Sequence, residues 1–181
     1  MVYSGLVLPL NDGEKEMSGP QEQIQNLYGV FVRVASSLQS ALLLCIRVYF
    51  GLWPAGIALN GWGKLHNLPH VTEFFASLGL PAPGATAAFV STFEFVAGIL
   101  LAVGLLSRVA ALGLAIDMLT AYITSDREAL SSFFSDPSKF YNADPFIYLA
   151  FALVILIFGP GKIALDYLIE KKYANRRQVN N

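Results

Sequence analysis

The sequence predicts an all-α integral membrane protein, a four-helix bundle with an N-terminal amphipathic helix at the membrane interface. Its 181 residues are 55% hydrophobic and 14% charged, and the mean hydropathy is +0.52. Soluble domains have about a quarter charged residues, and a soluble core of this length cannot bury so many apolar side chains. Four long apolar stretches account for the excess. The lipid bilayer is therefore the predicted surrounding of most of the chain.

Residues 1–40 are predicted to form a polar arm followed by the amphipathic interfacial helix. The arm, residues 1–23, carries charged residues, glycine and proline, a composition typical of a loose segment. Apolar residues then recur at three- and four-residue spacing, which is typical of a helix lying in the membrane surface. They are Ile24, Leu27, Tyr28, Phe31, Val34 and Leu38.

Residues 41–170 are predicted to form the transmembrane domain. A stretch of about 22 residues spans about 33 Å as a helix, which matches a hydrocarbon core of about 30 Å. The first two stretches have this length, the third is shorter, and the fourth has only about 14 residues, below the usual minimum. The predicted spans are Ala41–Trp62, Ala85–Leu106, Val109–Ile123 and Pro145–Phe158.

The connections between these spans are also predicted from their patterns. Leu68–Leu78 has helical apolar spacing and is expected to be a short interfacial helix. Ser125–Asp144 is polar with four aromatic residues, which suit a loop at the headgroup level, and residues 171–181 are expected to be a basic, solvated tail. Most of the lysines and arginines fall on one side of the predicted bundle, so both termini are predicted to be cytoplasmic.

Composition excludes several classes of function. The formal net charge of −1 and a sequence pI near 6.1 provide no basic field for nucleic acid. A single cysteine, Cys45, excludes an intrachain disulfide, a paired-thiol redox site and covalently attached haem. No metal site is predicted, and no nucleophile motif of a hydrolase is present. No covalently bound cofactor is expected.

Three charged residues lie inside the predicted spans, where each costs about 2.5–3.5 kcal/mol near the bilayer centre. They are Arg47, Glu94 and Asp117. Each shares a helical face with glycine, alanine, serine or threonine, and such small-residue stripes mark close helix contacts. The three charges are therefore expected to point into the bundle, with the long Arg47 side chain reaching the two carboxylates.

The charge balance of this group leaves alternatives open. Arg47 could pair with Glu94 or Asp117 merely to fix the register of the helices. Two carboxylates against one guanidinium would leave a surplus negative charge, unless one acid is protonated, Lys64 contributes, or a polar ligand binds. Arg47, Lys64, Glu94 and Asp117 are therefore the candidate ligand-binding residues, for a quinone head group or for proton relay. Gly61–Lys64 and Gly159–Lys162 are interpreted as helix terminators with a lysine reaching the interface.

Five short motifs, in order and at fixed spacing, resemble the DoxX family of small four-helix membrane proteins. They are Arg47–Gly51, Gly61–Leu65, Phe74–Pro81, Phe93–Arg108 and Phe158–Lys162. The resemblance implies a protein of the bacterial inner membrane, and some relatives are described as membrane subunits of thiosulfate:quinone oxidoreductase. Others are linked to a membrane-associated oxidoreductase assembly with soluble partners. Arg47, Lys64, Glu94 and Arg108 carry the family's polar pattern, without any catalytic assignment.

The leading hypothesis is a membrane subunit of a quinone-linked oxidoreductase, which is not an enzyme alone. With no paired thiol and no histidine in a predicted span, electrons could pass only through a bound quinone or a partner's cofactor. Other protein subunits are therefore expected partners. The alternative is a non-catalytic accessory subunit that stabilises a larger membrane complex, with the N-terminal segment as its extra contact surface.

Overall fold

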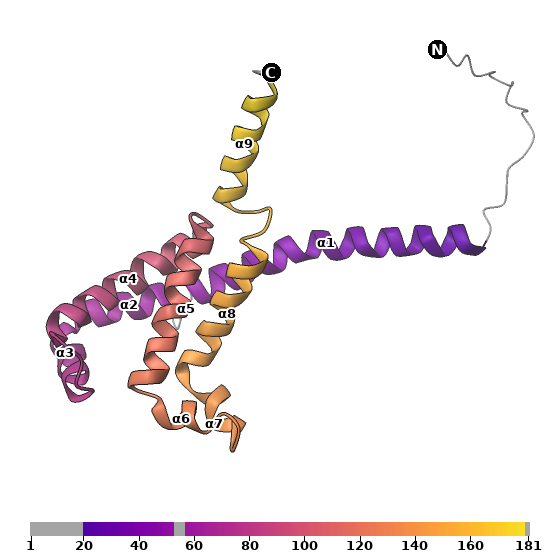
Figure 1. The fold of residues 1–181 in the computed structure, drawn as a ribbon. Helices are drawn as coiled ribbons and strands as arrows, with labels where there is room; N and C mark the ends of the chain where they lie inside the picture. The colour runs from indigo at the N-terminus through magenta and orange to yellow at the C-terminus, as the bar shows by residue number, and fades with distance from the viewer. Residues whose placement is uncertain (1–19, 53–56, 180–181) are drawn as a thin grey trace, which may run out of the picture. The chain divides into compact units, whose positions relative to one another are not determined.

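All regular structure in the described part of the chain is helical, so the all-α prediction is confirmed. The structure is a computed structural model that describes residues 20–52 and 57–179 (Figure 1). The predicted polar arm over residues 1–19 lies outside this part. The helices are α1 (Pro20–Leu52), α2 (Ile57–His66), α3 (Leu68–Ser77), α4 (Pro83–Val103), α5 (Ser107–Thr124), α6 (Arg127–Ser131), α7 (Pro137–Asn142), α8 (Asp144–Phe158) and α9 (Leu165–Val179).

The described residues include three candidate membrane spans that are long and apolar enough to cross a membrane: one over Gln23–His66, which takes in most of α1 and all of α2, then α4 and α5. α8 is apolar but has only 15 residues, or about 22 Å at the helical rise. The described helices therefore agree with the prediction of several candidate membrane spans. They also agree with the prediction that the fourth apolar stretch is short.

The N-terminal region differs from the predicted separate interfacial helix, because α1 continues through residue 40 without a break. The chain divides into two compact units, one ending at Ser36 and the other beginning at Ser37. The predicted first span, Ala41–Trp62, includes the end of α1 and the start of α2, and residues 53–56 between them are outside the described part. α1 up to Ser36 therefore belongs to the first unit, and the rest of α1 belongs to the second.

α2 packs on α4 with its backbone in direct contact, and two glycines make this possible. A β-carbon on Gly61 would lie 2.6 Å from the carbonyl oxygen of Ser91, and one on Gly98 would lie 2.5 Å from the amide nitrogen of Ala58. Real β-carbons do not approach so closely, so no larger residue fits without moving a helix. The predicted small-residue face of α4 is confirmed, since Ala87, Ser91, Gly98 and Ala102 are all buried.

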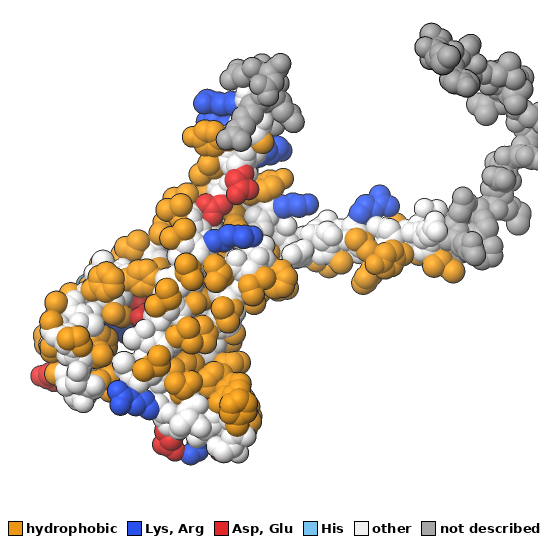
Figure 2. Space-filling view, viewed as in Figure 1, with side chains coloured by type: hydrophobic (Ala, Val, Ile, Leu, Met, Phe, Trp, Pro, Cys, Tyr) orange, Lys and Arg blue, Asp and Glu red, His pale blue; other side chains and the backbone are white. Residues whose placement is uncertain are grey.

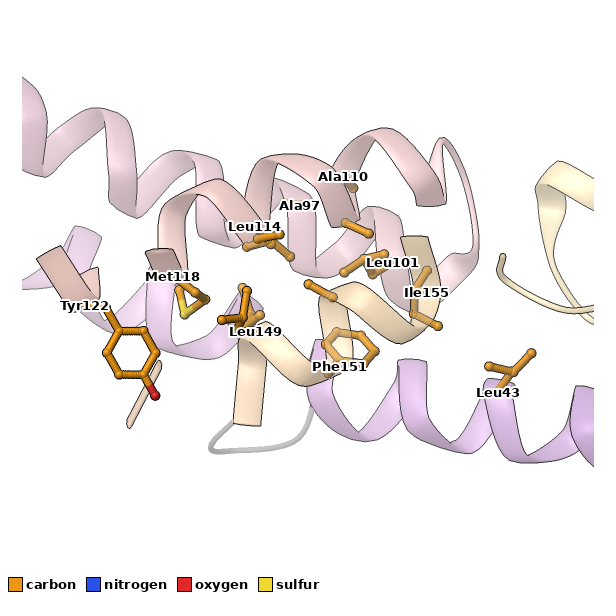
Figure 3. Packing of buried hydrophobic residues seen from close by; sticks show 14 residues of the cluster. Leu43, Ala97, Leu101, Ala110, Leu114, Met118, Tyr122, Leu149, Phe151 and Ile155 are labelled. Carbon is orange, nitrogen blue, oxygen red and sulfur yellow. The ribbon is translucent and has the colours of Figure 1, made fainter. Parts of the chain in front are cut away.

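α5 packs against α8 through a different face from the predicted one. The buried side chains of α5 include Ala111, Leu114, Ala115, Met118 and Tyr122, and they meet Leu149, Phe151, Ala152 and Ile155 of α8 (Figure 3). On the predicted stripe of α5, Ala110 is buried, Asp117 is half-buried and Thr120 is exposed. The predicted stripe therefore lies beside this face and is turned in part toward α4, since a β-carbon on Gly113 would lie 2.6 Å from the ring of Phe93.

One segment predicted as a loop contains two short helices, and most of the predicted basic tail is helical. Ser125–Asp144 contains α6 and α7, and an aromatic group holds them against the end of α5. The rings of Tyr122 and Phe140 stack at 4.7 Å, and the Tyr122 hydroxyl donates to the Phe140 carbonyl oxygen at 2.7 Å. At the C-terminus, α9 covers most of the predicted solvated tail. The predicted interfacial helix Leu68–Leu78 corresponds to α3.

Candidate functional site: a polar cluster between apolar helices

Lys64 and Glu94 form an ion pair between α2 and α4. The Lys64 ammonium lies 2.6 and 2.7 Å from the two carboxylate oxygens of Glu94. The Glu94 side chain is only 6% exposed, whereas that of Lys64 is 37% exposed. The close approach at Gly61, one turn before Lys64, brings the lysine over the carboxylate. The prediction that Gly61–Lys64 ends a helix is wrong, because Gly61 lies inside α2.

Asp117 of α5 completes the cluster. Its side chain hydrogen bonds with that of Glu94, and a bond between two carboxyl groups requires a proton on one of them. Oδ2 of Asp117 is buried, with no hydrogen-bond partner in the described part of the chain. One ammonium, two carboxyls and one shared proton leave the cluster neutral. The cluster can therefore hold a proton, and Oδ2 of Asp117 can accept a further hydrogen bond.

Further polar groups border this cluster that the sequence reasoning missed. The Asn60 amide, one turn before Lys64, donates to the Tyr148 hydroxyl of α8 at 3.2 Å, and Tyr148 is close enough to Glu94 for an electrostatic interaction. Ser91, one turn before Glu94, is fully buried, and its hydroxyl has no partner among the described groups. Asn60 could have been found from the sequence, because it is a polar amide side chain within an apolar stretch. No group of three metal-ligating side chains occurs in the described residues.

Arg47 does not join this cluster, so its predicted pairing with Glu94 or Asp117 is wrong. Its guanidinium is fully buried and donates to the carbonyl oxygens of Leu101, at 3.3 Å, and Ile163. Leu101 lies two turns, about 10 Å, along α4 from Glu94. The last carbonyls of a helix lack internal partners and carry partial negative charge. Arg47 therefore caps the C-terminus of α4 instead of bridging to the carboxylates.

The same end of the structure contains a second cap, Asp166, which the sequence reasoning also missed. Its two carboxylate oxygens accept hydrogen bonds from the amides of Leu106 and Ser107, each at 2.8 Å. These amides begin α5, where Leu106 has a left-handed φ of 48°. The amide of Asp166 in turn donates to the Gly104 carbonyl oxygen at 2.8 Å. Arg47 and Asp166 thus tie the turn between α4 and α5 to the loop between α8 and α9.

The C-terminal motif Phe158–Lys162 has a structural explanation in this junction. Gly159, with φ 78°, ends α8 as predicted, and the amide of Lys162 lies 3.4 Å from the Ser40 hydroxyl of α1. Arg108 adds a long contact, 3.5 Å, from its guanidinium to the Ile157 carbonyl oxygen. Of the four candidate residues, the structure therefore brings together Lys64, Glu94 and Asp117 and places Arg47 in a helix-end junction.

Comparison with known proteins agrees with these features. Residues 42–127 match the family model described as DoxX. Over 109 residues the chain is 35% identical to an uncharacterized membrane protein of Mycobacterium tuberculosis, a match that covers 54% of this chain and 64% of that protein. No solved structure matches the chain at comparable significance. The apolar helices and this homologue indicate a multi-pass membrane protein, and residues 42–127 are similar to the DoxX family.

Proposed function

We propose that this protein is the membrane subunit of a quinone-linked oxidoreductase, and that Lys64, Glu94 and Asp117 form its quinone and proton site. The observation that carries the proposal is the ion pair of Lys64 with the buried Glu94, beside the half-buried Asp117, within three mainly apolar helices. Such intramembrane charges are costly, and they commonly mark ligand or proton pathways. Some members of the DoxX family, which the chain resembles, are described as membrane subunits of thiosulfate:quinone oxidoreductase, and this favours a quinone over other polar ligands.

The chemistry of the cluster suits the reduction of a quinone to a quinol, which takes two electrons and two protons. A quinone offers two carbonyl oxygens, which need hydrogen-bond donors. Lys64 has ammonium hydrogens and is partly exposed, and the carboxyl pair of Glu94 and Asp117 holds a proton that can be given and replaced. The electrons would come from a redox-active partner subunit, because the chain has one cysteine and no histidine in a predicted span.

The proposal includes a four-span arrangement in the bacterial inner membrane. The first span would combine the end of α1 with α2, and α4, α5 and α8 would be the others, with α8 lengthened by local thinning of the bilayer. Both termini would be cytoplasmic, because Arg108, Lys162 and the lysines and arginines of α9 lie on the same side in this topology.

Quinone retention tests this function directly. Glu94→Gln removes the charge that holds Lys64 in place, so purified protein is expected to retain at least fivefold less quinone than wild type. The matched control is Glu128→Gln, the same change in the exposed pair of Glu128 and Lys139, which should leave retention unchanged. Quinone is extracted from protein in mild detergent and quantified by chromatography. Equal retention in wild type and a folded Glu94→Gln protein would refute the site.

A second function, as an accessory subunit, is favoured by α1 before Ser36. This part of the helix has large exposed apolar side chains: Ile24, Leu27, Tyr28, Phe31 and Val34 are each more than half exposed. They would suit the surface of a larger membrane complex or the lipid interface.

Deleting residues 1–40 distinguishes the two functions. If the N-terminal segment is the contact surface, the shortened protein should separate from its complex while the quinone content per protein is unchanged. Mass spectrometry of the proteins that co-purify in mild detergent measures the loss of the complex. Extraction and chromatography measure the quinone content per protein. An unchanged set of co-purifying proteins would argue against the accessory function, and loss of quinone alone would contradict the assignment of the site to Lys64, Glu94 and Asp117.

A further inference from the structure

Five exposed cations gather where α4 turns into α5 and where α8 leads into α9. Arg108 is in the first turn of α5, Lys162 is in the loop after α8, and Lys171, Lys172 and Arg176 are on α9. We call these five residues the basic cluster; Figure 2 shows lysine and arginine side chains on α9 and beside the loop that precedes it. The ion pairs of the described residues involve Lys64 and Lys139, so no described carboxylate neutralises the basic cluster.

One of the acidic residues beside the basic cluster, Asp166, is already engaged. Both carboxylate oxygens of Asp166 accept hydrogen bonds from the first amides of α5. Arg108 makes only the long contact to the Ile157 carbonyl oxygen, which leaves most of its five N–H donors for another group. Glu170 of α9 is the remaining exposed acid at this end. The basic cluster therefore has an excess of positive charge and of unused donors.

The other end of α5 lacks this excess. Arg127 donates to the Ile123 carbonyl oxygen at 2.7 Å, and Lys139 donates to Glu128 at 2.6 Å. That hydrogen bond lowers the pKa of Glu128 and raises the pKa of Lys139. Both cations at this end thus have partners within the chain. The two ends therefore differ in that Lys139 has a carboxylate partner and Arg127 makes a shorter hydrogen bond than Arg108 does.

Exposed apolar side chains adjoin the cations of the basic cluster. Each has between 52% and 67% of its surface exposed; they are Leu106, Val109, Ile157, Phe158, Ile163 and Leu168. A ligand that covers both features must carry a negative head and a long apolar tail. A phospholipid with an anionic headgroup has this chemistry, whereas free phosphate would leave the apolar side chains uncovered, and an acidic soluble protein would lack acyl chains.

We propose that the basic cluster binds the headgroups of anionic phospholipids while the neighbouring apolar side chains contact their acyl chains. Each lysine or arginine near a membrane surface strengthens such binding by about fivefold. The lipid would hold α9 and the loop before it at the membrane surface. This inference does not depend on quinone binding, because the residues involved are different from those of the polar cluster.

Competition between two lipids tests the proposal. Full-length protein is stripped of lipid in detergent and incubated with equal amounts of phosphatidylglycerol and phosphatidylcholine that have the same acyl chains. Retained lipids are counted by native mass spectrometry. The wild type should prefer phosphatidylglycerol, and Arg108→Gln/Lys162→Gln should reduce this preference about fivefold for each charge removed. Raising the salt concentration should also reduce it, because ions screen exposed charges.

The structure provides a matched control at the other end. Arg127→Gln/Lys139→Gln removes the same two kinds of charge and should leave the lipid preference unchanged, while Arg108→Lys, which keeps the charge, should preserve most of it. Inorganic phosphate added at millimolar concentration should not displace the lipid. Equal retention of the two lipids by wild type, an equal loss in the control variant, or displacement by inorganic phosphate would each overturn the proposal.

Discussion

Replacing Arg47 with leucine is expected to lower the free energy of unfolding by about 3–5 kcal/mol, the largest change predicted for any single substitution here. The guanidinium is fully buried and donates to the carbonyl oxygens of Leu101 and Ile163. Bonds from a charged donor each contribute about 1.5–3 kcal/mol, and leucine would remove both of them, leaving the Leu101 carbonyl with the Gly104 amide as its donor. Unfolding in mixed micelles of increasing denaturing detergent, followed by circular dichroism, measures the change.

The control for this substitution is Arg33→Leu. Arg33 is exposed and donates to the Gly29 carbonyl oxygen one turn earlier in α1, so its replacement should change the free energy of unfolding by less than about 0.5 kcal/mol. Arg47→Lys should lie between wild type and Arg47→Leu, because a single ammonium cannot reproduce the two separate guanidinium bonds. A stability of Arg47→Leu equal to that of Arg33→Leu would show that the junction does not need its cap.

Replacing Lys64 with methionine is expected to lower the free energy of unfolding by about 2–3 kcal/mol. Methionine would leave the Glu94 carboxylate, 6% exposed, without its ion-pair partner. Breaking a fully buried pair costs about 3–5 kcal/mol, and the partial exposure of Lys64 reduces this value because solvent screens the pair. Asp117 makes the loss worse, since it adds a second carboxyl group to the same site.

The double variant Lys64→Met/Glu94→Met should recover most of that stability, because removing both charges leaves no unpaired ion in an apolar site. The quinone content of the double variant should nevertheless stay low, because two of the proposed binding residues are absent. The double variant therefore distinguishes an effect on fold stability from an effect on quinone binding. The corresponding double change at Lys139 and Glu128, an exposed pair, should alter neither quantity measurably. A double variant as unstable as Lys64→Met would mean that the ion pair is not the source of the lost stability.

Much of the fold is readable from local pattern. Long apolar runs predict α4, α5 and α8 to within a few residues, because apolar side chains in lipid require a helix with internally bonded backbone. The same patterns predict the small-residue face of α4 and the presence of Glu94 and Asp117 inside the helices. These inferences depend on neighbours in the sequence or on the average depth of a residue in the bilayer.

The partners of the charged residues depend on helix register, which local pattern does not specify. Lys64 reaches Glu94 because Gly61 allows α2 to lie directly on α4. Arg47 is predicted to reach a carboxylate, but it donates to the Leu101 carbonyl near the end of α4 and to the Ile163 carbonyl in the loop after α8. Asp166 caps amides about 60 residues away in the sequence. Such contacts can be located only once the helices are placed.

The cap formed by Arg47 also has a consequence for how the chain is made. Arg47 enters the membrane early in synthesis, but one of its acceptors is 54 residues later and the other is 116 residues later. Until Ile163 has been synthesised, the guanidinium lacks part of its hydrogen bonding in an environment where an unsatisfied charge is costly. A chain released before that point would keep a poorly satisfied charge in its first span. Only a chain that extends through the loop after α8 can therefore supply both acceptors of the Arg47 guanidinium.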